Sequence, residues 1–261
     1  MQYKYMTGLE ETEIGELVER IETILDEHGL ATAWQHNGRK PVLDLFDQVV
    51  LTLASLRTNI TQELAGAWFG VSQPTVSVIK SRIEPLLDQA LAMTGISLGE
   101  AAQTRPLIVD GTYVPTGNRH GKGKENYSGK RHCQNLSVLV ACDLEGRLVA
   151  TSTPVPGARH DAATIELTGW KDMLADANWM ADSAFCATNA ITPVRKKRHI
   201  ELADSQKAFN KQVSAIRCIV ERCISHLKNW KIIAKGYRRQ LKRLPFTIAL
   251  VTKLELYRLG W

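Results

Sequence analysis

Three acidic residues, far apart in the chain, each lie in a segment whose pattern indicates an ordered element. Asp110 belongs to the β-branched run Leu107–Pro115, Asp182 follows a short apolar run, and Glu221 lies within a long stretch of helical spacing. One such acid is weak evidence, because an aspartate at a strand end is as often a turn former as a ligand. Three acidic side chains that lie close together in the folded chain would bind divalent metal, since Mg²⁺ prefers carboxylate oxygens. The fold must therefore bring three distant segments together.

The order of the expected elements meets this requirement. Apolar runs predict five strands, at Leu107–Pro115, Gln134–Cys142, Arg147–Val155, Trp179–Phe185 and Ala190–Val194. Helical spacing predicts a helix from about Asp161 to Leu174, a long one over Lys207–Ile233 and a last one over Leu244–Leu259. This order predicts an α/β domain with a ribonuclease H-like, mixed five-stranded sheet and flanking helices. In that arrangement the first and fourth strands lie side by side, so that Asp110 and Asp182 become neighbours.

The residues before this domain are expected to be all-α. Helices are predicted over Glu10–His28 and Val42–Leu56, and two shorter ones, Thr61–Trp68 and Gln73–Ile83, enclose a tight turn that contains Gly70. The stretch Leu91–Arg105 has the composition of a linker. We therefore expect a helical domain over residues 1–100 and the α/β domain over residues 101–261.

The two shorter helices match the helix-turn-helix pattern over about residues 59–84. Val76, Ile79 and Ile83 are spaced to face inward. The polar residues that we expect outward, within reach of bases and phosphates, are Gln73, Thr75, Ser77, Lys80 and Arg82. An ordinary helical hairpin has the same spacing, and the charge of the rest of the chain favours DNA binding.

That charge is unevenly distributed. Residues 1–30 hold eight acids against two basic residues, whereas the chain from Ile191 onward holds 17 Lys and Arg against four acids. The basic excess thus lies in the part of the chain that closely follows Asp182 and carries Glu221, which indicates a polyanionic partner such as DNA. A solvated basic face would usually contain interspersed acids.

The cysteines indicate a reducing compartment. They form no paired framework and follow no secretory signal, so we expect a cytoplasmic protein with reduced thiols at Cys133, Cys142, Cys186, Cys218 and Cys223. Zinc binding by Cys218 and Cys223 is disfavoured, because no Cys-x-x-Cys pair is present. No apolar run has the length of a membrane span.

The three acids suit phosphodiester chemistry. Two Mg²⁺ or Mn²⁺ ions about 3.5–4 Å apart activate the attacking oxygen, stabilise the leaving oxygen and neutralise phosphate charge. Asp110 would bridge both ions, Asp182 would bind one and Glu221 the other. Arg217 lies one helical turn before Glu221 and Lys228 two turns after it, so both share its face and can hold phosphates of the scissile strand.

Five short motifs resemble one known family. They are Val109-Asp-Gly-Thr112, Tyr127-Ser-Gly-Lys130, Pro156-Gly-Ala-Arg-His-Asp161, Ala181-Asp-Ser-Ala-Phe185 and Val220-Glu-Arg222. Together they resemble the DDE-type transposases of bacterial insertion sequences and, more closely, the DDE superfamily endonucleases, whose eukaryotic relatives are the Harbinger transposases. The resemblance covers nearly the whole chain. It implies metal-dependent DNA strand transfer, with Asp110, Asp182 and Glu221 on the family's acidic positions.

The spacing Arg217-x3-Glu221-x6-Lys228 also resembles the signature around the glutamate of related insertion-sequence enzymes. The tyrosine that usually begins this signature is replaced by Ser214. The segment between Asp182 and Glu221 is too short to contain the inserted domain that some of these enzymes have.

Other polar residues are alternatives or auxiliaries to this set. Asp161 is a rival for the second acid, although its place after His160 at a helix start is that of a capping residue. His160 is a possible auxiliary group. Lys130 and Arg131 are expected to touch the DNA backbone, and a solvated loop explains them nearly as well.

The expected function is that of a transposase, which cuts transposon ends and uses the freed 3′-hydroxyl to attack target DNA. Its partners would be double-stranded DNA, as terminal inverted repeats and as target, and a second copy of the chain, since two ends must be joined. We expect it in the bacterial cytoplasm, at the nucleoid. The alternatives are a DNA-binding protein derived from a transposase and a metal-dependent nuclease without strand transfer.

Overall fold

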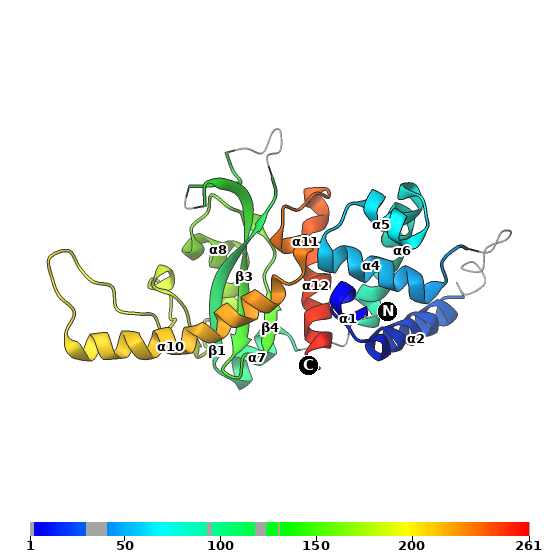
Figure 1. The fold of residues 1–261 in the computed structure, drawn as a ribbon. Helices are drawn as coiled ribbons and strands as arrows, with labels where there is room; N and C mark the ends of the chain where they lie inside the picture. The colour runs from blue at the N-terminus through cyan, green and yellow to red at the C-terminus, as the bar shows by residue number, and fades with distance from the viewer. Residues whose placement is uncertain (1–2, 30–40, 93–95, 118–123, 130, 261) are drawn as a thin grey trace. The chain divides into compact units, whose positions relative to one another are not determined.

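The computed structural model describes residues 3–29, 41–92, 96–117, 124–129 and 131–260 (Figure 1). The chain divides into two compact units. The first unit comprises residues 1–94 with two later segments, 229–232 and 253–261, and the second comprises residues 95–228 and 233–252. Each is described by itself.

The first unit is helical. Its helices are α1 (Tyr3–Thr7), α2 (Glu11–Glu27), α4 (Leu45–Thr58), α5 (Gln62–Phe69) and α6 (Gln73–Ala90). Helix α4 is buried continuously from Gln48 to Leu56, so it forms the centre against which the others pack. Helix α2 buries one stripe of apolar side chains and leaves its acids exposed, as the spacing predicts.

Helices α5 and α6 form the predicted helix-turn-helix. Thr61 caps α5 by accepting a hydrogen bond from Leu64 N at 3.2 Å, and Ser72 caps α6 by accepting one from Thr75 N at 3.3 Å. Gly70 has φ +67° in the turn. The pair packs so closely that a Cβ on Gly66 would lie 2.5 Å from the carbonyl oxygen of Val71, so glycine is required there.

The C-terminal segments of the first unit are held by a buried acid. Glu255 is 1% exposed and accepts hydrogen bonds from Trp230 Nε1 at 2.8 Å and from Arg258 Nη2 at 2.6 Å. Arg57 stacks over the Trp230 ring, 5.1 Å from its centroid. The contacts of Trp230 with Glu255 and with Arg57 are long-range in sequence, whereas Arg258 and Glu255 are three residues apart. Among the helices that the structure describes, none combines the length and apolar character that crossing a membrane requires.

The second unit is built on a mixed sheet. Its strands are β1 (Leu107–Pro115), β2 (Tyr127–Ser128), β3 (Cys133–Asp143), β4 (Leu148–Thr151), β5 (Val155–Pro156) and β6 (Trp179–Met180). The order along the sheet is β2-β3-β1-β6, and β4 and β5 also pair with β3. Strands β1 and β3 are antiparallel along the whole of β1, whereas β1 and β6 are parallel. The predicted pairing of the first strand with the one that precedes Asp182 is confirmed.

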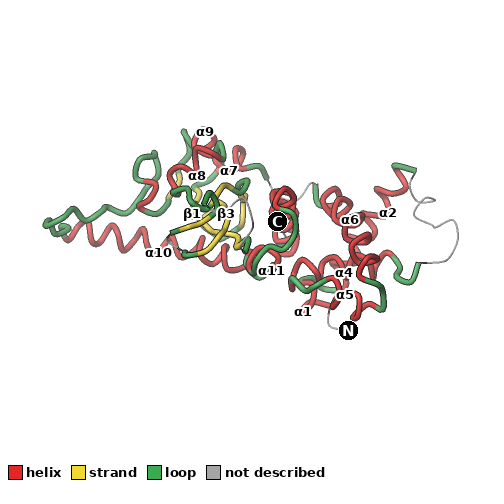
Figure 2. The backbone as a smooth tube through the Cα atoms, turned by 90° about the horizontal axis from the view of Figure 1, so that it is seen from above, coloured by secondary structure: helices red, strands yellow, loops and turns green. Residues whose placement is uncertain are grey.

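Helices lie on both faces of the sheet. Figure 2 shows α7 (Leu98–Thr104), α8 (Asp161–Leu167) and α9 (Trp170–Met173) on one side and α10 (Asp204–Leu227) on the other. The core on the first side combines alternate residues of the strands, such as Val109 and Leu139, with Ile165 and Trp170 from the helices. Short α11 (Lys231–Ala234), a 3₁₀ turn at Leu241–Arg243 and α12 (Leu244–Arg258) follow α10.

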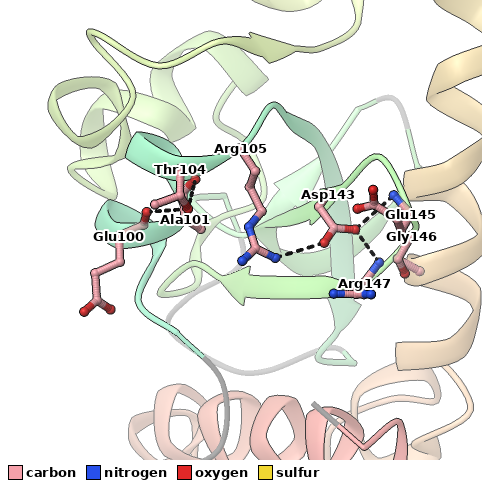
Figure 3. A network of polar contacts seen from close by, with 9 residues as sticks. Glu100, Ala101, Thr104, Arg105, Asp143, Glu145, Gly146 and Arg147 are labelled. Carbon is pink, nitrogen blue, oxygen red and sulfur yellow. Dashed lines mark hydrogen bonds and ion pairs between the residues drawn. The ribbon is translucent and has the colours of Figure 1, made fainter.

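A buried carboxylate fixes the hairpin between β3 and β4 (Figure 3). Asp143 is 1% exposed, and its Oδ1 accepts hydrogen bonds from Glu145 N at 3.1 Å and Arg147 N at 2.8 Å. Its Oδ2 accepts one from Arg105 Nη1 at 3.2 Å. This side chain closes the turn between the two strands and ties it to the end of α7.

Several predicted elements differ from those observed. Among the described residues the sheet has six strands, not five: the predicted third strand is divided into β4 and β5, and β2 was not predicted. The predicted fourth strand stops at Met180, and its expected continuation is the 3₁₀ helix η1 (Ser183–Phe185); the fifth is reduced to a bridge between Met180 and Ile191. Leu91–Arg105 is not only a linker, because Ser97 and Glu100 form a capping box that starts α7.

Candidate functional site

The sheet aligns two of the three predicted acids. Leu107 pairs with Trp179 and Ile108 with Met180 in the parallel register of β1 and β6. Asp110 and Asp182 each lie two residues beyond the second pair. Parallel strands present equivalent positions at the same edge, so both carboxylates reach one region of the second unit.

That region is a cavity of about 690 Å³. Both aspartates line it, together with the polar side chains Ser128, Arg131, Asn135, Ser137, Arg159, His160, Arg195 and Arg217. Two carboxylates therefore share a hollow with four guanidinium groups. This charge pattern suits a ligand that combines metal cations with phosphate anions.

Asp110 is held by an ion pair. Its Oδ1 accepts the backbone N–H of Gly111 at 2.8 Å, and its Oδ2 lies 3.2 Å from Arg217 Nη2 on α10. The side chains of Asp110 and Arg217 are only 21% and 18% exposed, so solvent screens the pair weakly. Arg217 Nε is buried and, within the part of the chain that the structure describes, has no hydrogen-bond partner.

Asp182 is oriented by the turn that replaces the predicted strand end. Its Oδ1 accepts the backbone N–H of Ala184 at 2.5 Å and so caps η1. Arg195 donates a hydrogen bond to the carbonyl oxygen of Ser183, the next residue. The carboxylate is therefore fixed by backbone on one side, with an arginine anchored beside it.

Glu221 lies apart from this pair. It is exposed on α10, one turn after Arg217, and does not line the cavity. In the described residues, no three His, Cys, Asp or Glu side chains gather as a metal site needs. The oxygen donors of Asp110 and Asp182 fit Mg²⁺ or Mn²⁺. The participation of Glu221 stays a prediction.

Lys228 supports the strand that carries Asp110. Its ammonium donates to the carbonyl oxygen of Tyr113, lies 3.4 Å from the carbonyl oxygen of Ile233 and stands 5.1 Å from the Tyr113 ring centroid. Burial is the larger cause and the charge of Arg131 the smaller one, and together they lower the pKa of Lys228 to about 8. Arg131 covers the Tyr113 ring at 4.4 Å. The predicted phosphate contact of Lys228 stays a prediction, and the structure adds an internal role.

The five helix-turn-helix residues that were predicted to point outward differ in exposure, and their contacts with DNA stay a prediction. Thr75 and Ser77 are exposed, and Gln73 and Arg82 are half-buried. The outward orientation of Lys80 is wrong, because this residue is only 5% exposed. Lys80 lies four positions after Val76, on the stripe that faces the other helices, and α6 continues to Ala90. The four-residue spacing already carried this signal in the sequence.

Among the auxiliary residues, His160 and Arg131 line the cavity. Lys130 lies outside the described residues. Asp161 begins α8, and its side chain lies outside the described part as well. Arg159 and Arg195 also line the cavity and were not predicted as site residues, although Arg159 belongs to the motif Pro156–Asp161 and Arg195 opens a basic run.

No disulfide joins any of the five cysteines, all of which lie in the described part of the chain. Burial and a hydrogen bond with Cys223 raise the pKa of the Cys142 thiol, the hydrogen bond being the larger cause. Cys223 itself donates to the carbonyl oxygen of Gly146 at 2.8 Å. Both thiols therefore serve packing between β3 and α10.

Comparison with known proteins identifies what the chain resembles. Residues 109–254 match the family model described as DDE superfamily endonuclease, and residues 41–92 match the helix-turn-helix of DDE superfamily endonuclease. A protein of Streptomyces albus G, described as a transposase for insertion sequence element IS112, is 30% identical over 87% of this chain and 83% of its own length. A protein of Microchaete diplosiphon, described as a transposase for insertion sequence element IS702, is 23% identical over 85% of this chain and 84% of its own length. No solved structure is significantly similar.

Proposed function

The chain belongs to the DDE superfamily endonucleases of insertion-sequence transposases, and we propose that it cleaves transposon ends and transfers the freed 3′-hydroxyl to target DNA. The observation that carries the proposal is the shared cavity of Asp110 and Asp182, which β1 and β6 align in parallel register. Members of this family are generally dependent on divalent metal. The sheet order, with helices on both faces, supports a ribonuclease H-like fold for the second unit.

The residues that would hold two Mg²⁺ or Mn²⁺ ions are Asp110, Asp182 and Glu221. Bound ions supply an activated oxygen nucleophile and neutralise the charge that develops on the phosphate. Asp110 and Asp182 would hold the metal from the ends of their two parallel strands. Glu221 completes the set from α10, where it follows Arg217 by one turn.

Arg217 has two tasks in this site. In the absence of metal it neutralises Asp110, across 3.2 Å. Arg217 also lines the cavity, and its guanidinium is a donor for a phosphate oxygen of the scissile strand. Arg131 and Arg159 line the same cavity and hold the neighbouring phosphates. Each arginine fixes the strand relative to the two carboxylates, which is the positioning that in-line attack needs.

Recognition of the element belongs to the helix-turn-helix. Thr75 and Ser77 are exposed near the start of α6, the end of a recognition helix that reads base edges. Gln73 contacts Gln62 of α5, so it stabilises the pair of helices in addition to any DNA contact. We propose the terminal inverted repeats as the sequence that is read, a homodimer as the species that joins two ends, and the bacterial nucleoid as its place of action.

The test is cleavage of a duplex that carries the terminal repeat flanking the coding region, with Mg²⁺ present. The wild-type chain is expected to cut at the repeat end and to join the 3′ end to a second duplex. Asp110→Asn is expected to bind the same DNA without cutting it. Cleavage by Asp110→Asn at the wild-type rate would overturn the site assignment. Cleavage by the wild type without any joined product would instead identify a metal-dependent nuclease.

A further inference from the structure

A basic segment extends from the cavity beside Asp182. Arg195, Lys196, Lys197 and Arg198 are consecutive, and each is exposed. We call residues 195–198 the basic tract. Only Arg195 lines the cavity, so the tract begins at the site and leads away from it. The functions assigned above use none of its other members.

The start of the tract is fixed to α10 by a side-chain clamp. Asn210 Oδ1 accepts the backbone N–H of Val194 at 2.8 Å, and Asn210 Nδ2 donates to the carbonyl oxygen of Val194 at 3.0 Å. The amide thus satisfies both backbone groups of one residue, as a neighbouring strand would. The residue immediately before the tract is therefore held in place.

The first cation of the tract is fixed at the acid pair. Arg195 donates to the carbonyl oxygen of Ser183, which directly follows Asp182. The guanidinium has further N–H donors beyond the one that this bond uses. It is therefore placed to contact a ligand that Asp182 helps to hold.

The far end of the tract is a turn. Ile200 N donates to the carbonyl oxygen of Lys197 at 3.2 Å, and His199 has φ +62°. Lys196 pairs with Glu201 at 2.5 Å, but the two side chains are 55% and 79% exposed. An exposed pair of this kind contributes little and exchanges readily with another anion. Lys197 and Arg198 lie at the turn, open to solvent.

We propose that the basic tract binds the backbone phosphates of the DNA strand that leaves the active site on the side of Asp182. This inference rests on the proposed function, since it takes the cavity as the place of cleavage. Consecutive cations that are anchored at one end and exposed at the other fit a polyanionic strand, whose affinity comes from released counterions. The contacts are to phosphate, so the tract fixes register and not sequence.

The test measures binding alone, so it does not depend on cleavage. The full chain carries Asp110→Asn, divalent metal is chelated, and fluorescence anisotropy follows binding to the terminal-repeat duplex over a range of KCl concentrations. The test variant is Lys197→Ala/Arg198→Ala. The control is Lys171→Ala/Lys207→Ala, which removes the same charge from two exposed lysines that do not line the cavity.

Loss of two phosphate contacts is expected to reduce the slope of log K against log salt by about 1.8 in the test variant. The control is expected to keep the wild-type slope. Equal slopes in the two double variants would overturn the proposal, even if the enzyme cleaves DNA. If the test variant shows the smaller slope but the wild-type chain never cleaves DNA, the phosphate-binding role of the basic tract stands and the transposase activity is refuted.

Asn210→Ala supplies a second measurement at unchanged net charge. Without the clamp at Val194, the tract must be ordered when DNA binds, and affinity is expected to fall roughly five-fold. Circular dichroism of the variant checks that the fold is retained. Wild-type affinity in a folded Asn210→Ala chain would show that the anchoring has no part in binding.

Discussion

Replacing Arg217 by glutamine is expected to lower the stability of the metal-free chain and to increase the stabilisation that a bound metal ion provides. The change removes the cation from a pair in which Asp110 is 21% and Arg217 18% exposed. Breaking a fully buried pair costs about 3–5 kcal/mol, whereas an exposed pair is worth at most about 1 kcal/mol. Asp110 also keeps its hydrogen bond from Gly111 N at 2.8 Å. For Arg217→Gln we therefore expect an intermediate loss of about 2 kcal/mol in the free energy of unfolding.

This loss corresponds to a fall in Tm of about 4–8 °C, since about 2–4 °C accompanies each kcal/mol in a domain of roughly 150–250 residues. Mn²⁺ is expected to reverse the fall in Tm, because a bound cation replaces the positive charge of Arg217 beside Asp110. In the wild-type chain the same ion must first displace Arg217, so its stabilising effect is smaller. Arg217→Gln should therefore bind Mn²⁺ more tightly than the wild type.

Differential scanning calorimetry with and without Mn²⁺ measures both effects. Arg222→Gln is the matched control, because Arg222 is exposed on the same helix, one residue after Glu221. A Tm for Arg217→Gln equal to that of the control would refute the role of the ion pair. An identical Mn²⁺ shift in all three proteins would refute competition between Arg217 and metal at Asp110.

Two further predictions concern the scaffold of the site. Burial lowers the pKa of Lys228 from 10.5 to about 8. Between these two pH values the unfolded chain holds a proton that the folded chain has lost, so the free energy of unfolding rises with pH. Lys228→Met should remove this rise in urea titrations, and identical pH profiles for the variant and the wild type would contradict the burial of a titrating ammonium. Asp143→Asn should cost about 1–3 kcal/mol, because the buried carboxylate loses the charge that faces Arg105 while its acceptors are rearranged; an unchanged urea midpoint would contradict the role given to this side chain.

The sequence predicts best the elements whose pattern is strictly local. Strand β1 has the predicted bounds, Leu107–Pro115, because its β-branched run is bounded by proline at both ends. Thr61, Gly70 and Ser72 likewise signal the helix-turn-helix through capping and turn chemistry that depends on few neighbours. The proximity of Asp110 and Asp182 follows from element order, which fixes which strands are adjacent.

The sequence predicts less well where a neighbour decides the outcome. Phe209 has the spacing of a core residue but is 39% exposed, because the first turns of α10 extend past the sheet (Figure 1). Helical spacing cannot show how far the partner surface reaches. The run after Met180 was expected to continue as a strand, but the carboxylate of Asp182 accepts the N–H of Ala184 and turns the chain instead.

The cavity shows the same limit. Arg195 reaches the site through its bond to the Ser183 carbonyl, and Arg159 through the path of the chain into α8. Both belong to segments that the sequence marks only as basic or as family-like. Which of many basic side chains enters one cavity is decided by tertiary contacts that composition does not contain.

The central claim is that three carboxylates act together, and Glu221 is its least supported member because it does not line the cavity. The most direct measurement is Mg²⁺-dependent cleavage of the terminal-repeat duplex by Glu221→Gln beside the wild type, with Glu166→Gln, an exposed residue of α8, as the control. The account predicts that Glu221→Gln binds the duplex and does not cut it, while Glu166→Gln cuts at the wild-type rate. Equal cleavage by both variants would contradict a three-carboxylate site.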